Sequence, residues 1–341
     1  MDVQFLVERD DSETLRVLQS LRLPDSFRVR LVPDLYPRTK PKACQFGLLK
    51  ARGRYLVIYD AEDIPDPDQL KVAVAAFRKA GPRVACLQAK LNYYNKNWNL
   101  LTRLFTAEYS TWFGLYLPGL MRLNAPIPLG GTSNHFRVDV LREIGGWDPF
   151  NVTEDCDLGI RLHRRGWRTR VIDSTTWEEA NSELRNWLRQ RSRWVKGYIQ
   201  TYFVHTRSLG RWARVPVGDT LGFHMMVFGT FFALLINPVY WGVSVLWVAT
   251  RWELIPALYP GVVGRLAAFC LIVGNGFFIV SHVAGAVRAR FYDLVPYVVL
   301  LMPVYWALMS VAAYKGLMQF VYTPHYWEKT RHGLRRGGWM G

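Results

Sequence analysis

Cysteine is scarce in this chain of 341 residues, and the four present, Cys44, Cys86, Cys156 and Cys270, are scattered along it. They form neither a disulfide framework nor the spacing of a metal-ligand set, which argues against a disulfide-stabilised scaffold and a zinc module. We therefore expect a reducing compartment. Met1 leads almost directly into an apolar pattern, so we expect no signal peptide.

Acidic residues are also few, 27 against 43 lysines and arginines, which gives a formal net charge of +16. In a soluble protein this excess would suggest a nucleic-acid partner. Here the basic residues lie beside long apolar runs, which favours an anionic substrate or an anionic membrane surface. We expect no nucleic-acid partner.

The first 205 residues alternate between short strand patterns and helical patterns. VQFLV, FRVRLV, RYLVIY and RVACLQA are separated by SETLRVLQSL, KACQFGLLKA and PDQLKVAVAAFRKA. This alternation predicts an α/β domain with a mostly parallel sheet and helices on both faces. Such folds bind ligands at the carboxyl ends of their strands, which is where the acidic stretches VERDD and YDAED fall.

The second part of the chain, residues 206–341, contains long apolar runs: no charged residue lies between Asp219 and Arg251, and the next run carries only Arg265. The runs at about 219–250 and 262–285 are each long enough to cross a bilayer, which takes ~20 apolar residues. A third run, about 293–320, contains two prolines and many aromatic residues. It lies along the membrane interface or forms a third transmembrane helix. We prefer the interfacial interpretation, because it places the basic tail, 321–341, in the cytoplasm with the other basic clusters.

Three carboxylates, Asp60, Glu62 and Asp63, follow the apolar run RYLVIY. Carboxylates that lie close together repel one another unless a cation or several donors hold them. A hard divalent cation takes oxygen ligands from one or two carboxylates and from substrate phosphates. The alternative is a helix N-terminus that favours acids, which is our interpretation of Asp66 and Asp68.

Six stretches occur in a characteristic order: VERDDSET, TKPKA, YDAED, GGTSNHFR, VTEDCDLGIRL and QRSRW. Together they resemble the motifs of membrane-embedded family-2 glycosyltransferases, such as bacterial cellulose synthase, hyaluronan synthase and chitin synthase. No single motif is specific, but the ordered set, which ends just before the membrane runs, is highly specific. The resemblance covers nearly the whole chain and implies a GT-A-like α/β domain followed by transmembrane helices.

The resemblance implies a metal site and a donor site. Asp60 and Glu62 match the family's metal-binding Asp-x-Asp, and because Glu62 departs from the usual Asp, Asp63 shares or replaces its role. The implied cation is Mg²⁺ or Mn²⁺, which neutralises charge on a departing nucleoside diphosphate.

Further residues match the family's donor-binding positions. Asp10 or Asp11 corresponds to the uridine-contacting Asp, with a helix cap as the alternative. Lys42 corresponds to the lysine that faces the diphosphate, with a solvated surface lysine as the alternative. Arg193 can hold diphosphate oxygens with its planar guanidinium.

Asp155 matches the family's catalytic base, which takes the proton from the acceptor hydroxyl. The alternative for Asp155 is an acid that satisfies a helix N-terminus, which is also our interpretation of Glu154 and Asp157.

The resemblance implies an acceptor site made of an aromatic ring, a glutamine and two glycines. Trp194 offers a ring face for the terminal sugar, and Gln190 lies on the same side of the helix. Gly130 and Gly131 would let a sugar approach the backbone closely. The plainer interpretation of QRSRW is a basic amphipathic helix at the membrane.

The C-terminal end of the chain matches the family pattern only in part, and the N-terminal end departs from it. YWEKTRHG weakly resembles the gating loop of cellulose synthase, with Lys329 and Thr330 as its residues. The family normally opens with a strand and a Pro-x-Tyr-x-Glu-like segment, whereas Met1 begins at what resembles the second strand. We therefore expect the first strand to be missing and a sheet edge to be exposed.

The resemblance implies an inverting, processive glycosyltransferase with its catalytic domain, residues 1–205, on the cytoplasmic side of the inner membrane. It would move a hexose or N-acetylhexosamine from a UDP-sugar onto a growing β-linked exopolysaccharide. Its partners would be the donor, the polysaccharide, the lipid bilayer and, as a further option, an accessory export subunit. The alternatives are a non-processive transferase with a lipid-linked acceptor and a catalytically inactive truncated scaffold.

Overall fold

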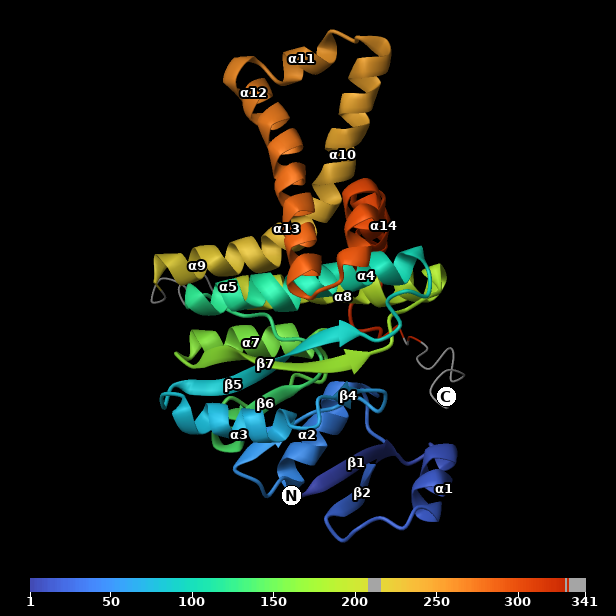
Figure 1. Ribbon diagram of the computed structural model, residues 1–341, viewed down its shortest axis with the longest axis vertical. Helices are drawn as coiled ribbons and strands as arrows, with labels where there is room; N and C mark the ends of the chain where they lie inside the picture. Colours follow the sequence, from blue (N-terminus) through green and yellow to red (C-terminus); the bar gives the residue numbers. More distant parts are fainter. Residues whose placement is uncertain (208–215, 329, 331–341) are drawn as a thin grey trace.

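The computed structural model describes residues 1–207, 216–328 and 330. Figure 1 shows three parts along the long axis: an N-terminal strand pair, a central sheet with its helices, and helices that project beyond them. The projecting helices meet the central part at one of its ends.

The N-terminal part contains β1 (Val3–Glu8), α1 (Ser12–Ser20), β2 (Phe27–Val32) and α2 (Lys40–Lys50). β1 and β2 pair in parallel through the crossover helix α1, as the alternating pattern predicts. Within the described part of the chain, β1 pairs with β2 alone. α2 packs against both strands and leads into the central sheet.

The central sheet has the strand order β3-β6-β5-β7-β4. Its strands are β3 (Tyr55–Val57), β4 (Ile64–Pro65), β5 (Val84–Tyr93), β6 (Asn134–Arg137) and β7 (Arg168–Glu178). The long strands β5 and β7 run parallel side by side and form the centre of the domain.

The expected α/β class is confirmed, but the strand pairing is mixed rather than mostly parallel. β6 lies antiparallel between β3 and β5, and β4 pairs antiparallel with the edge of β7. Both strands are short, so they leave no clear alternation in the sequence from which they could be predicted.

Helices cover the sheet and separate it from the apolar helices. They are α3 (Gln69–Lys79), α4 (Leu100–Thr111), α5 (Leu117–Arg122), α6 (Val138–Glu143), α7 (Glu154–Arg164) and α8 (Leu184–Thr206). A π-helical turn joins α4 to α5. In Figure 1, α4, α5 and α8 form a layer between the sheet and the projecting helices.

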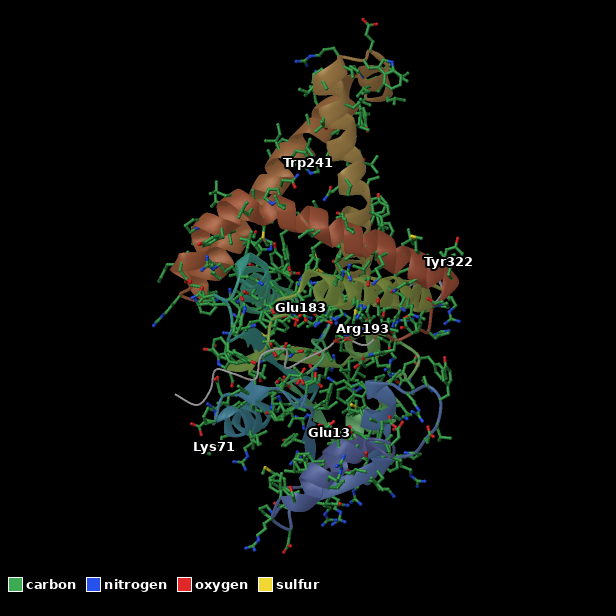
Figure 2. All side chains as sticks on the ribbon, turned by 90° about the vertical axis from the view of Figure 1, so that its right-hand side faces the viewer. Glu13, Lys71, Glu183, Arg193, Trp241 and Tyr322 are labelled. Atoms are coloured by element: carbon green, nitrogen blue, oxygen red, sulfur yellow. The ribbon has the colours of Figure 1, made fainter. Side chains whose placement is uncertain are left out.

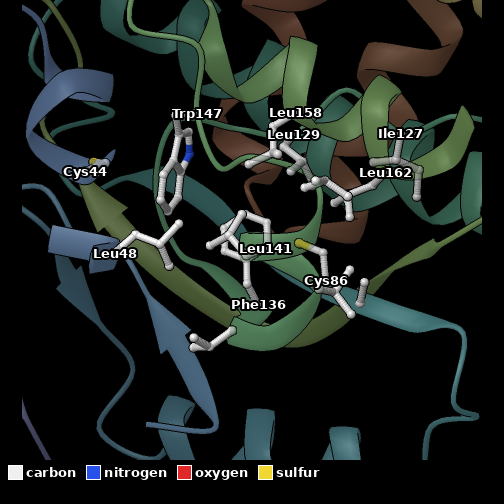
Figure 3. Packing of buried hydrophobic residues seen from close by; sticks show 14 of the residues in the cluster. Cys44, Leu48, Cys86, Ile127, Leu129, Phe136, Leu141, Trp147, Leu158 and Leu162 are labelled. Atoms are coloured by element: carbon white, nitrogen blue, oxygen red, sulfur yellow. The ribbon is translucent and has the colours of Figure 1, made fainter. Parts of the chain in front are cut away.

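The largest apolar core lies between the sheet and α6 and α7 (Figure 3). Phe136 of β6 meets Trp147 edge to face at 5.8 Å, and Leu141 and Leu158 fill the space beside them. Each fully buried side chain of this size stabilises the fold by roughly 1.5–3 kcal/mol. Leu158 and Leu162 of this core anchor α7 to the sheet.

The apolar region consists of α9 (Val217–Phe223), α10 (Gly229–Thr250), α11 (Leu254–Leu258), α12 (Gly261–Phe269), α13 (Asn275–Arg288) and α14 (Val295–Tyr322). Three runs are long and apolar enough to cross a membrane, with mean hydropathies of 1.7, 2.0 and 1.9: Val217–Thr250, Gly261–Arg288 and Tyr292–Tyr322. The three apolar runs seen in the sequence are therefore helical and suggest membrane association.

The third apolar run differs from the first two in its packing. Its apolar window is 28% buried, against 6% and 11% for the others. Figure 2 shows why: α14 lies across the layer that contains α8, at a steep angle to α10. α14 is thus part of the domain's helical layer as well as an apolar run.

The crossing of α8 and α14 depends on a glycine. A Cβ atom at Gly316 would lie 2.6 Å from the carbonyl oxygen of Ser192 and 3.2 Å from the backbone nitrogen of Lys196. Backbone atoms cannot rotate away as a side chain can, so a methyl group here would force the two helices apart.

We predict that Gly316→Ala destabilises the protein by about 1–3 kcal/mol, the usual cost of overpacking. The measurement is the thermal unfolding midpoint of the purified protein in one detergent. Gly242→Ala in α10 is the matched control, because a Cβ there meets no heavy atom within 4 Å. Equal midpoints for the two variants would contradict the close crossing.

The sheet also contains a buried histidine. His135 in β6 is 3% exposed, and burial lowers its pKa to about 4. The unfolded chain binds a proton at this position below about pH 6.5, whereas the folded chain does not. The stability from neutral His135 is therefore present above pH 6.5 and is lost as the pH falls toward 4.

We expect His135→Gln to reduce the acid sensitivity of the fold. Between pH 7.5 and pH 5 the parent should lose about 2 kcal/mol more unfolding free energy than the variant. Denaturant titrations at the two pH values measure this difference of slopes, so a lower starting stability of the variant does not matter. Parallel pH profiles would show that His135 does not cause the loss.

Candidate active site

A cavity of about 490 Å³ lies where the carboxyl ends of the central strands meet α8. Its walls come from the loop after β3, the segment before β6, the start of α7, and helices α8, α10 and α14. The cavity therefore joins the sheet to the apolar helices. Carboxylates gather at its sheet end, and apolar side chains of α10 and α14 extend its helical end.

Acidic side chains line the sheet end of the cavity: Asp60, Glu62, Asp63 and Glu178. Asp63 Oδ2 accepts hydrogen bonds from the backbone N–H of Asp60 at 2.7 Å and from the hydroxyl of Thr132. Burial and the neighbouring Asp60 raise the pKa of Asp63 to about 6. Burial, together with Asp63 and Asp60, also raises the pKa of Glu178 well above its usual range.

Lys40 supplies the positive charge that holds this acidic end together. Its Nζ forms an ion pair with Asp60 and donates to the carbonyl oxygen of Gly131 at 2.8 Å. Burial alone would lower the pKa of Lys40, but the carboxylates of Asp60 and Glu154 raise it. A charged lysine beside the strand ends can also bind phosphate oxygens of a ligand.

The acidic end fits a divalent cation that is shared with a ligand. In the described ranges, no three His, Cys, Asp or Glu side chains are grouped so that they could hold a metal ion by themselves. Mg²⁺ bound with a nucleotide needs only one or two carboxylates, because phosphates and water supply the other ligands. Asp60 lies at the cavity, and Asp63 Oδ1 is buried with no hydrogen-bond partner among the described residues.

Two more carboxylates, Glu154 and Asp155, begin α7 at the wall of the cavity. Asp155 Oδ1 accepts from the backbone N–H of Cys156 at 2.7 Å. Its other oxygen would lie 3.5 Å from a Cβ at Gly131, so the glycine keeps this approach open. Burial raises the pKa of both carboxyls, and Lys40 acts against this rise.

Arg193 of α8 lies opposite these carboxylates, between the helical layer and the sheet (Figure 2). Its Nη1 donates to the carbonyl oxygen of Val152 at 3.5 Å, and its buried Nε has no partner in the part of the chain that is described. The ring of Trp327 lies 4.6 Å from the guanidinium carbon. Arg193 therefore has unused donors at the cavity.

The apolar end of the cavity begins at Trp194. The rings of Phe105 and Tyr109 lie 6.2 Å from its ring centre. Gln190 also lines the cavity, and its side-chain oxygen accepts from Asn181 at 2.9 Å. Beyond Trp194, residues of α10 and α14 continue the wall: Thr230, Phe231, Leu234 and Met309.

The structure brings most of the residues singled out in the sequence to this one cavity. They are Asp60, Glu62, Asp63, Gly130, Gly131, Asp155, Gln190, Arg193, Trp194 and Thr330. Lys329 lies outside the described residues.

Lys42, Asp10 and Asp11 lie away from the cavity. Lys42 pairs with Glu8 at 2.9 Å, and Asp11 caps α1 by accepting from the backbone N–H of Thr14 at 3.1 Å. Asp10 pairs with Arg38 at 2.6 Å. The cavity wall thus contains Lys40 in place of Lys42.

Sequence reasoning missed several residues of the cavity: Lys40, Glu108, Glu178, Arg191 and Trp327. The signal for Glu178 was present, because it ends the strand pattern STTWE as Asp60 ends RYLVIY. Glu108 becomes a neighbour of the other site residues only through the fold, whereas Lys40, Arg191 and Trp327 stand within the stretches TKPKA, QRSRW and YWEKTRHG.

Comparison with known proteins identifies the relatives of this chain. Residues 55–327 match the model of the glycosyl transferase family group 2. Probable glycosyltransferase YdaM of Bacillus subtilis (strain 168) is 28% identical over 171 residues, 48% of this chain and 40% of that protein. Glucomannan 4-beta-mannosyltransferase 2 of Arabidopsis thaliana is 31% identical over 170 residues, 48% of this chain and 32% of that protein. The match thus spans less than half the length of these relatives.

A solved structure shares the fold. The mannosyltransferase PcManGT from Pyrobaculum calidifontis, in complex with GDP-Man and Mn²⁺, is 18% identical with a TM-score of 0.55. The likeness covers 94% of this chain and 77% of that chain. It confirms a GT-A-like α/β domain followed by long apolar helices.

We predict that Lys40, and not Lys42, supports binding of a nucleoside diphosphate. Lys40→Met should weaken the binding of UDP or GDP by about tenfold or more, since a hydrogen bond to a charged group contributes about 1.5–3 kcal/mol. Isothermal titration in the presence of Mn²⁺ measures the affinity. Lys42→Met, the control two residues away, should retain the parent affinity, and the opposite ranking would restore Lys42 as the ligand.

Proposed function

We propose a reaction for this chain on the premise that it belongs to the glycosyl transferase family group 2 and is therefore a glycosyltransferase. The reaction is an inverting, processive transfer of a hexose or N-acetylhexosamine from a UDP-sugar to a growing β-linked polysaccharide. The observation that carries the proposal is one cavity whose wall contains several carboxylates, Lys40, Arg193 and Trp194.

Mannose is a second candidate for the transferred sugar. The name of one relative is a glucomannan 4-beta-mannosyltransferase, and the structural neighbour is in complex with GDP-Man. A GDP-mannose donor would use the same diphosphate-binding groups, because these groups bind the diphosphate and not the nucleobase. UDP-sugars and GDP-mannose therefore belong in one assay.

In the proposed reaction, the sheet end of the cavity binds the donor diphosphate. Lys40 and Arg193 present positive charge to its oxygens, and their burial strengthens this interaction because water screens it less. Asp60 and Asp63 would hold Mg²⁺ or Mn²⁺, which neutralises the charge of the departing nucleoside diphosphate when it is bound. Glu62 is a third carboxylate for this cation, at the same sheet end of the cavity.

Asp155 is the proposed base. It takes the proton from the acceptor hydroxyl as that oxygen attacks the anomeric carbon from the face opposite the diphosphate, which inverts the configuration. Burial raises the pKa of Asp155, which makes its carboxylate a stronger base, while Lys40 and Arg193 keep it ionised.

Trp194 and Gln190 are the proposed acceptor residues. The ring of Trp194 offers a stacking face for the terminal sugar, and the wall beyond it continues to α10 and α14. A growing chain that leaves along this wall reaches the apolar helices directly, which supports processive synthesis over transfer to a lipid-linked acceptor. Gly130 and Gly131 would allow the sugar to approach on the opposite side, and Lys329 and Thr330 would act as a gating loop.

We propose that residues 1–205 form the cytoplasmic catalytic domain and 206–341 the membrane region of an inner-membrane protein. The runs that end at Thr250 and begin at Gly261 would cross the bilayer as a hairpin. α14 would lie at the cytoplasmic interface, an orientation supported by its packing across α8.

The test is to incubate membranes that contain the protein with radiolabelled UDP-glucose, UDP-N-acetylglucosamine and GDP-mannose, with Mn²⁺, Mg²⁺ or a chelator. Insoluble polymer that needs the cation is the expected product with one donor. Label in a lipid extract would instead support a lipid-linked acceptor. No transfer and no donor hydrolysis with any donor would contradict the proposed enzyme.

We predict that Asp155→Asn lowers transfer by roughly 10²- to 10⁴-fold, the contribution of a general base. Asparagine keeps the shape of the side chain but cannot accept the proton. Affinity for the nucleoside diphosphate should stay within a few-fold, since Asp155 faces the acceptor. Initial rates and nucleotide titrations of the same preparation measure the two effects.

Glu154→Gln is the matched control for this prediction, because Glu154 is the neighbouring buried carboxylate on the same helix turn. It should retain more of the parent rate than Asp155→Asn. An Asp155→Asn protein that transfers sugar at more than about a tenth of the parent rate would contradict the assignment. Loss of the general base should lower the transfer rate at least 10²-fold.

A further inference from the structure

A partly buried ion pair forms part of the wall at the helical end of the cavity. Arg191 of α8 is 3% exposed, and its Nη1 donates to Glu108 Oε1 of α4 at 2.8 Å while its Nη2 pairs with Oε2. Tyr305 of α14 donates its hydroxyl proton to Glu108 Oε2 at 2.6 Å and accepts from Arg191 at 2.9 Å. The three side chains thus join three helices.

The guanidinium of Arg191 is also packed among aromatic rings. Its central carbon lies 4.2 Å from the ring centre of Phe105 and 4.6 Å from that of Trp194. The ring of Trp187 lies 5.4 Å away. A planar cation against a tryptophan face is attractive, so the position of Arg191 restricts the position of Trp194.

Glu108 is committed to this pairing and is therefore a poor candidate for a second base. Both of its oxygens accept from Arg191, and one also accepts from Tyr305. A bidentate contact fixes the plane of the guanidinium as well as its place. Tyr305 and Glu108 thus fix the orientation of the Arg191 guanidinium, and the guanidinium in turn restricts the orientation of the Trp194 ring.

We infer that Glu108, Arg191 and Tyr305 form a positioning unit that holds the Trp194 ring for the acceptor sugar and couples this ring to α14. The inference rests on the proposed acceptor role of Trp194. The residues of the unit act through Trp194 and not on the reacting atoms. A shift of α14 would change acceptor binding, because Tyr305 lies on that helix and is 1% exposed.

The test compares variants of the full chain in lipid nanodiscs, with mannohexaose and cellohexaose as probes of the acceptor site. Arg191→Lys keeps the charge but loses the planar, bidentate contact, and Tyr305→Phe removes one hydroxyl. Both should weaken oligosaccharide binding, Arg191→Lys by about tenfold, since a stacked and bidentate arginine is not replaced by lysine. The affinity for the nucleoside diphosphate should stay near that of the parent.

Tyr314→Phe is the matched control, because this α14 tyrosine donates to the carbonyl oxygen of Leu235 at 2.6 Å, away from the unit. It should bind the oligosaccharides as the parent does. A cycle with Trp194→Ala adds a readout that general destabilisation would not give: once the ring is removed, Arg191→Lys should have little further effect.

The outcomes separate this inference from the proposed function. Parent-like oligosaccharide binding by Arg191→Lys and Tyr305→Phe, or effects that add to that of Trp194→Ala, would overturn the positioning unit alone. Failure of the parent to bind either probe, or unchanged binding by Trp194→Ala, would contradict the acceptor site itself. Equal losses of nucleotide and oligosaccharide binding would show a purely structural role.

Discussion

The mutual repulsion of buried carboxylates is the constraint on which this site depends. Asp60, Asp63, Glu154, Asp155 and Glu178 all face one cavity, and burial raises the pKa of four of them. Buried charges of one sign remain together only if opposite charges lie among them. Lys40 and Arg193 supply these charges from two sides, α2 and α8. The site is thus assembled from parts of the chain that are distant in sequence, and a cationic metal would complete the same balance.

Helix α8 connects this electrostatic site to the apolar region. One face carries Arg193 and Trp194 at the cavity, and another packs against α14 at the glycine crossing. A rigid helix transmits small displacements along its length, because protein interiors are close-packed. The chemistry and the apolar helices therefore share one structural element and do not form two loosely joined domains.

Local patterns in the sequence predicted the α/β class and the apolar helices, and the ordered motifs of the resemblance indicated ten of the residues that line the cavity. A strand that ends in acids, a helix that begins in acids and a basic helix before apolar runs are all visible in single stretches. The choice between Lys40 and Lys42 is not, since residues two apart lie on nearly opposite sides of a helix and both fit the same motif. The short strand β6 and the contacts among Glu108, Arg191 and Tyr305 depend on long-range packing, which no local pattern encodes.

In the proposed membrane arrangement, the place of the cavity on α10 links the active site to bilayer thickness. α10 has 22 residues, which at 1.5 Å per residue is about 33 Å, close to the ~30 Å hydrocarbon core of a typical bilayer. Thr230, Phe231 and Leu234, which line the cavity, lie within the first two turns of this helix. In this arrangement a thinner membrane would tilt α10 and move these residues relative to the sheet. Hydrophobic mismatch would then change the shape of the proposed acceptor site, and lipid composition would become a variable of its activity.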